Sequence, residues 1–82
     1  MCKTLYIDLP GNSRDMYKGV IFGLVRYGFN ILQPRVAQTA TGMQVAVWVD
    51  HCCGDVTEAA NEFVRALPQG SSIEVDHANP FH

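Results

Sequence analysis

The chain has 82 residues and no apolar run that approaches the length of a membrane-spanning helix. Its first residues also lack the uninterrupted apolar core of a signal peptide, because Asp8, Pro10 and Gly11 interrupt the segment. We therefore expect a soluble, cytoplasmic protein that makes no contact with a membrane.

The sequence has few cysteines and histidines at the spacing that metal sites use. The chain has three cysteines, which cannot all pair with one another. His51-Cys52-Cys53 is the one cluster of ligand-type residues, and zinc sites usually separate paired cysteines by two to four positions. The alternatives are a metal site and a loop whose thiols fill space. We expect the second, with Cys52 and Cys53 reduced and with no metal or cofactor bound.

Motifs of catalysis are missing as well. Gly11 stands alone, so no glycine-rich loop is present to cradle a phosphate. No pattern marks a nucleophile with its base and an oxyanion pocket. We expect that the protein is not an enzyme.

Charge is sparse, at 17% of residues, and the net charge is −2. Residues 1–41 hold five basic and two acidic side chains, a net charge of +3, whereas residues 42–82 hold one basic and six acidic, a net charge of −5. A negative chain is not expected to attract nucleic acid or anionic lipid as a whole.

The most apolar stretch of the chain is residues 43–49, which include the single Trp. It is short, β-branched and flanked by Gly42 and Asp50, which predicts a strand in the middle of a sheet. Both of its alternating side-chain sets are largely apolar, so the pattern leaves open whether Trp48 faces a core or an uncovered face.

The other elements follow from periodicity and from cap and turn residues. Strands are predicted over residues 4–9, 30–38 and 72–76, and helices over 14–27 and from the capping Asp55 to the stop at Pro68. Pro34 predicts that its strand lies at an edge. We expect close packing against the helical glycines Gly19 and Gly23.

This order, β-α-β-β-α-β, predicts one α+β domain over residues 1–82, a ferredoxin-like sandwich. Its four-stranded antiparallel sheet would carry both helices on one face, with an irregular tail at about 77–82. The side chains expected to be buried together are Leu5, Ile7, Val20, Ile21, Leu24, Phe63 and Leu67.

Along nearly its whole length the chain resembles an RNA-recognition motif. Residues 5–8 are similar to the start of the family's first-strand motif, and residues 42–48 lie where its third-strand motif belongs. The resemblance implies the fold and single-stranded nucleic-acid binding. It places Tyr6 at a stacking position, and it places Met43 and Val45 where the family has two further stacking aromatics.

Two classes of function remain. The leading hypothesis is a non-catalytic protein-binding domain. By size and class it is similar to phage-encoded inhibitors of host defence, such as anti-CRISPR proteins, which would act in the host cytoplasm on a nucleic-acid-binding complex. The alternative is a degenerate RNA-recognition domain. A homodimer is also considered, because a strand that is apolar on both sides favours self-association.

The residues predicted to bind follow from these hypotheses. The expected sheet-face site consists of Tyr6, Asp8, Met43, Val45, Trp48 and Glu74. The alternative site, on the first helix, consists of Arg14, Lys18, Phe22 and Arg26. Tyr6 is expected on the uncovered face, because Leu5 and Ile7 are expected on the face beneath the helices and side chains alternate along a strand.

Overall fold

Six regular elements and one 3₁₀ turn make up the computed structural model, which describes residues 2–77. Their order is β1 (Lys3–Leu9), α1 (Arg14–Arg26), β2 (Phe29–Gln38), β3 (Met43–His51), α2 (Val56–Phe63), the 3₁₀ turn η1 (Val64–Ala66) and β4 (Ser72–Asp76). The predicted tail lies outside the described residues from position 78 onward.

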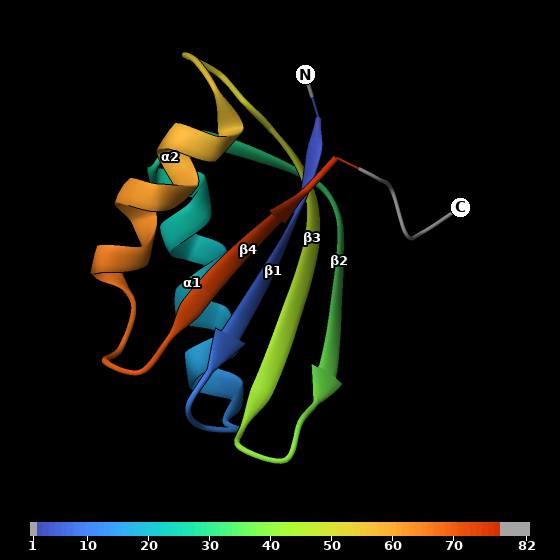
Figure 1. Ribbon diagram of the computed structural model, residues 1–82, viewed down its shortest axis with the longest axis vertical. Coiled ribbons are helices and arrows are strands. Elements are labelled where there is room, and N and C mark those ends of the chain that lie inside the picture. Colours follow the sequence, from blue (N-terminus) through green and yellow to red (C-terminus); the bar gives the residue numbers. More distant parts are fainter. Residues whose placement is uncertain (1, 78–82) are drawn as a thin grey trace.

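The four strands form one antiparallel sheet in the order β2-β3-β1-β4, with both helices on the same face (Figure 1). The predicted ferredoxin-like α+β fold is confirmed. β2 is an edge strand, as Pro34 predicts, since proline has no N–H to give to a second neighbour. A bulge between Ile31 and Gln33 shifts the pairing of β2 with β3.

Helix α1 begins at a side-chain cap, which accepts a hydrogen bond from a backbone N–H that has no carbonyl partner within the helix. The Ser13 hydroxyl accepts a hydrogen bond from the Met16 N–H at 3.1 Å, which satisfies one of the free donors of the first turn. The helix ends at Arg26, one residue before the predicted end. Gly28 follows with a φ of +92°, a conformation that glycine adopts without a steric penalty.

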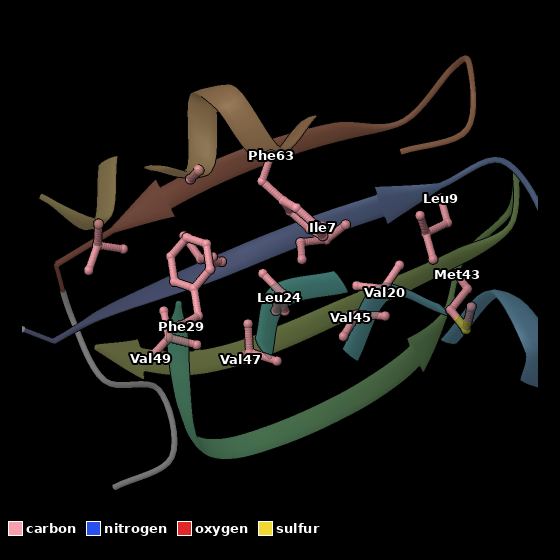
Figure 2. Close-up of a cluster of buried hydrophobic side chains, with 13 residues drawn as sticks. Ile7, Leu9, Val20, Leu24, Phe29, Met43, Val45, Val47, Val49 and Phe63 are labelled. Carbon is pink, nitrogen blue, oxygen red and sulfur yellow. The ribbon is translucent and has the colours of Figure 1, made fainter. Parts of the chain in front are cut away.

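The core fills the space between the helices and one face of the sheet (Figure 2). Leu5, Ile7, Val20, Leu24 and Phe63 are buried there, as predicted. Ile21 and Leu67 are half-buried and pack against the same cluster.

The two helical glycines differ in their surroundings. A Cβ on Gly23 would lie 2.9 Å from the Phe63 ring, so the expected close packing is confirmed there. A Cβ on Gly19 would meet nothing within 4 Å, and the expectation is wrong at that position.

Within the described residues, no helix is long and apolar enough to cross a membrane.

Candidate functional site

The face of the sheet that the helices leave uncovered, called here the open face, carries two aromatic side chains on its central strands. In the strand pairing, Tyr6 of β1 stands opposite Ala46 of β3 on one side and Glu74 of β4 on the other. Side chains directly opposite in a ladder point to the same face. Leu5 and Ile7 are buried beneath the helices, so alternation puts half-buried Tyr6 on the open face, as predicted.

Trp48 lies in the neighbouring row of the open face. Its partners in the pairing are Thr4 on β1 and Gln33 on β2. It is half-buried and does not belong to the core cluster. Because Ala46 stands opposite Tyr6, Trp48 is the diagonal neighbour of Tyr6, about 7–8 Å away between Cα atoms and within reach of aromatic side chains. The two largest side chains of the central strands therefore share one patch.

Met43 and Val45 do not belong to this site. They alternate with the open-face residues of β3 and are 3% and 0% exposed, and both pack in the core (Figure 2). The prediction that they bind a partner is wrong, because the strand turns this set toward the helices. The residues of β3 on the open face are Gln44, Ala46, Trp48 and Asp50.

The open face is acidic. Asp8 and Glu74 lie on it with Tyr6, and Asp76 stands opposite Thr4 in the Trp48 row. The Asp8 carboxylate accepts a hydrogen bond from Gln44 Nε2 at 3.3 Å, which holds one acid of this group in place. Within the four described strands, Arg35 is the one basic residue that the pairing puts on this face. Such a surface repels phosphate and suits a positively charged partner.

Asp50 extends the acidic surface at the end of β3. Its carboxylate accepts a hydrogen bond from the backbone N–H of His51 at 2.8 Å. That bond favours the charged form and lowers the pKa of Asp50 below its usual value. The carboxylate therefore remains negative at neutral pH.

The alternative site residues Arg14, Lys18, Phe22 and Arg26 are all exposed on α1. Phe22 is 65% exposed, the largest exposed fraction among the large apolar side chains of residues 2–77. Helix α1 covers the opposite face of the sheet, so these residues cannot join the open-face residues in one contact surface (Figure 1). The two predicted sites are separate.

The loop His51-Cys52-Cys53 is held by its own hydrogen bonds. His51 Nε2 lies 2.7 Å from the Tyr27 carbonyl oxygen, and the Cys53 backbone N–H donates to His51 Nδ1 at 3.3 Å. One neutral tautomer, protonated at Nε2, satisfies both contacts, so neither ring nitrogen is free to bind a metal. In the part of the chain that is described, no three ligand-type residues gather as a metal site would require.

The two exposed thiols of this loop lie side by side, with Sγ atoms 2.6 Å apart. The hydrogen bond between the two thiols raises the pKa of the Cys52 thiol, because donation by Cys52 favours its protonated form. A raised pKa lowers the thiolate fraction, which is the reactive form of cysteine. This arrangement does not activate Cys52 as a nucleophile.

Asp55 gives a prediction for the dependence of stability on pH. Its carboxylate accepts from the Thr57 N–H at 3.1 Å and from Lys3 Nζ at 3.3 Å. Both bonds lower the pKa of Asp55 below 3.8, and the bond from the Thr57 N–H has the larger effect. A carboxylate whose pKa is lower in the folded than in the unfolded state stabilises the fold at any pH above its unfolded-state pKa. This stabilisation is lost as the pH falls through the folded-state pKa.

Asp55→Asn removes the titrating charge and keeps a good N-cap residue. We expect the free energy of unfolding of this variant, measured with urea over a pH series, to fall less steeply with acid below pH 3.8 than that of the wild type. Identical pH profiles for the two proteins would contradict this role of Asp55.

Comparison with known proteins gives little beyond the fold. No protein-family model matches the chain, and no curated protein matches it significantly. A solved structure, described as the crystal structure of an unknown protein from Galdieria sulphuraria, is similar with a TM-score of 0.66 and 18% sequence identity. The likeness covers 100% of this chain and 48% of that one, so the chain spans about half the length of its neighbour. At this identity the likeness shows the fold alone.

Proposed function

We propose that the protein is a non-catalytic protein-binding domain that uses the open face of its sheet to contact a basic surface of its partner. The observation that carries the proposal is the pairing of β1 with β3, which brings Tyr6 and Trp48 together on the uncovered face. Aromatic side chains at the centre of a patch with a charged rim are typical of the residues that dominate binding energy at protein interfaces.

The acidic rim favours one kind of partner. Asp8, Glu74 and Asp76 present carboxylates beside the two aromatics, as phosphates would lie beside stacked bases. A nucleic-acid-binding complex offers a basic groove that such a surface complements. We therefore propose an inhibitor of a host defence complex, of the anti-CRISPR type, that acts in the host cytoplasm and is carried by a phage or mobile element.

Site-specific photo-crosslinking tests the location of the interface without disturbing its centre. Benzoylphenylalanine replaces Glu74, which is exposed opposite Tyr6, and in a matched control it replaces Val25, which is 58% exposed on α1. Irradiation in a lysate of the candidate host is expected to give a protein adduct from position 74 that Trp48→Ala abolishes. The proposal fails if adducts form only from position 25. An adduct of twice the chain's own mass would identify a second copy as the partner.

Tyr6→Ala is expected to weaken binding to the crosslinked partner by at least ~1 kcal/mol, as loss of an interface aromatic commonly does. The physical reason is the loss of apolar contact area at the centre of the patch. Calorimetry on the folded variant provides the measurement. Unchanged affinity for Tyr6→Ala, together with a large loss for Arg14→Glu or Lys18→Glu, would place the interface on α1.

Binding of single-stranded nucleic acid is the second candidate, because Tyr6 and Trp48 on the central strands form a platform of the kind on which bases stack. The single Trp lies on this platform, so its fluorescence reports directly on stacking. We expect no quenching by a single-stranded RNA oligonucleotide at physiological salt. Quenching that weakens steeply as salt is raised would favour the nucleic-acid function instead, because phosphate contacts release counterions.

A further inference from the structure

An apolar groove of about 340 Å³ lies between helix α1 and the chain from the end of α2 at Phe63 to Pro68. Both helices lie on the face of the sheet opposite the open face (Figure 1), so the groove is on that side of the molecule. Its volume falls in the lower part of the range of small-molecule pockets, roughly 300–1,000 Å³. The residues that form its walls include Met16, Gly19, Val20 and Gly23 of α1 and Phe63 and Leu67 from the other side.

Gly19 leaves the wall of this groove bare. Glycine weakens a helix interior relative to alanine, and a Cβ at this position would meet no atom within 4 Å. Close packing explains the glycine at position 23, where Phe63 fills the space, but none of the residues that the structure describes fills the space beside Gly19. The groove is therefore open at the point where a side chain could have closed it.

Arg26 gives the groove a charge at one end. It is the one charged residue among the lining residues. Within the described residues its guanidinium forms no ion pair or hydrogen bond. From Met16 to Arg26 the helix rises about 15 Å, at about 1.5 Å per residue, so the groove is long enough for an extended alkyl chain. An apolar channel that ends at an unpaired cation complements an anion with an apolar tail.

We propose that this groove binds a free medium-chain carboxylate, with the alkyl chain against Gly19 and Val20 and the carboxylate at Arg26. Burial of the chain supplies most of the affinity, since each buried methylene is favourable. The guanidinium selects the charged head, because a hydrogen bond between two charged groups is stronger than one between neutral groups. This site is independent of the open face and of the protein-binding function.

Calorimetry with decanoate below its micelle concentration tests the proposal on the wild type and on Gly19→Leu. Leucine is a better helix former than glycine, so this variant fills the groove without weakening α1. Gly54→Leu is the matched control, because a Cβ on Gly54 also meets nothing within 4 Å but the residue lies outside the groove. We expect a measurable dissociation constant for the wild type and for Gly54→Leu, and a loss of at least tenfold in affinity for Gly19→Leu.

A second arm tests the role of the charge. Arg26→Gln is expected to weaken decanoate binding by about tenfold, as loss of one hydrogen bond to a charged group implies, and to leave decanol binding unchanged. No binding of decanoate to the wild type, or equal binding to wild type and Gly19→Leu, would overturn the proposal. Equal losses of decanoate and decanol binding in Arg26→Gln would overturn the assignment of the carboxylate to Arg26.

Discussion

Phe63→Ala is expected to lower the free energy of unfolding by about 3–5 kcal/mol, as removal of a buried aromatic typically does. Phe63 is 2% exposed, and its ring meets Tyr27 edge-to-face at 5.2 Å and Phe29 at 6.4 Å between centroids. It also packs against the bare backbone of Gly23. A chain of 82 residues has a total stability of only about 4–12 kcal/mol, so this one residue supports a large share of the fold.

Phe22→Ala is the matched control for this experiment, because the same side chain is 65% exposed on α1. Its effect on stability is expected to stay within about 0.5 kcal/mol. Urea denaturation of both variants gives the two values. A loss for Phe63→Ala no larger than that for Phe22→Ala would contradict the account of the core.

Trp48→Ala is expected to weaken binding of the crosslinked partner by at least ~2 kcal/mol, about thirtyfold in the dissociation constant. Trp48 is the largest side chain of the central strands, and its removal would take apolar contact surface from the open face beside Tyr6. Calorimetry measures the affinity, and circular dichroism verifies that the variant is folded.

Val25→Ala serves as the control for Trp48→Ala. Val25 is exposed and apolar but lies on α1, so its truncation should leave the affinity unchanged. If Val25→Ala weakens binding and Trp48→Ala does not, the interface is on the helical side of the molecule.

Much of the fold follows from local patterns in the sequence. Leu5, Ile7 and Leu9 alternate with polar or aromatic neighbours, so β1 and its buried face are predictable without any tertiary information. Ser13, Gly28 and Pro34 mark a helix start, a helix end and an edge strand through backbone chemistry that acts within a few residues. These elements are observed close to where they are predicted.

The orientation of β3 is harder to predict, because both of its side-chain sets are largely apolar. The resemblance to the RNA-recognition motif puts Met43 and Val45 on the binding face, and the apolar pattern leaves either this set or Trp48 there. The sequence does contain a signal that Trp48 lies on the solvent-exposed face. Gln44 and Asp50 alternate in phase with Trp48, and polar residues are typical of the solvent-exposed side of a strand. The pairing with β1 fixes which side of β3 faces the helices, because it places Val45 opposite the buried Ile7.

Other parts of the candidate sites depend on contacts between segments that are distant in the sequence. Arg35 joins the open face only through the pairing of β2 with β3 across a bulge. The space beside Gly19 depends on how far α2 and η1 stand from α1, which no local pattern encodes. The glycine itself is visible in the sequence, but its empty surroundings are not.

Chemical-shift mapping of the ¹⁵N-labelled protein with its crosslinked partner is the most direct test of the open face as a protein-binding surface. The chain has one Trp, so the indole N–H of Trp48 gives a single cross-peak that lies on the proposed surface. We expect this peak and the amides of Tyr6 and Ala46 to show the largest changes. Changes confined to α1, around Lys18 and Phe22, with an unmoved Trp48 indole peak, would contradict it.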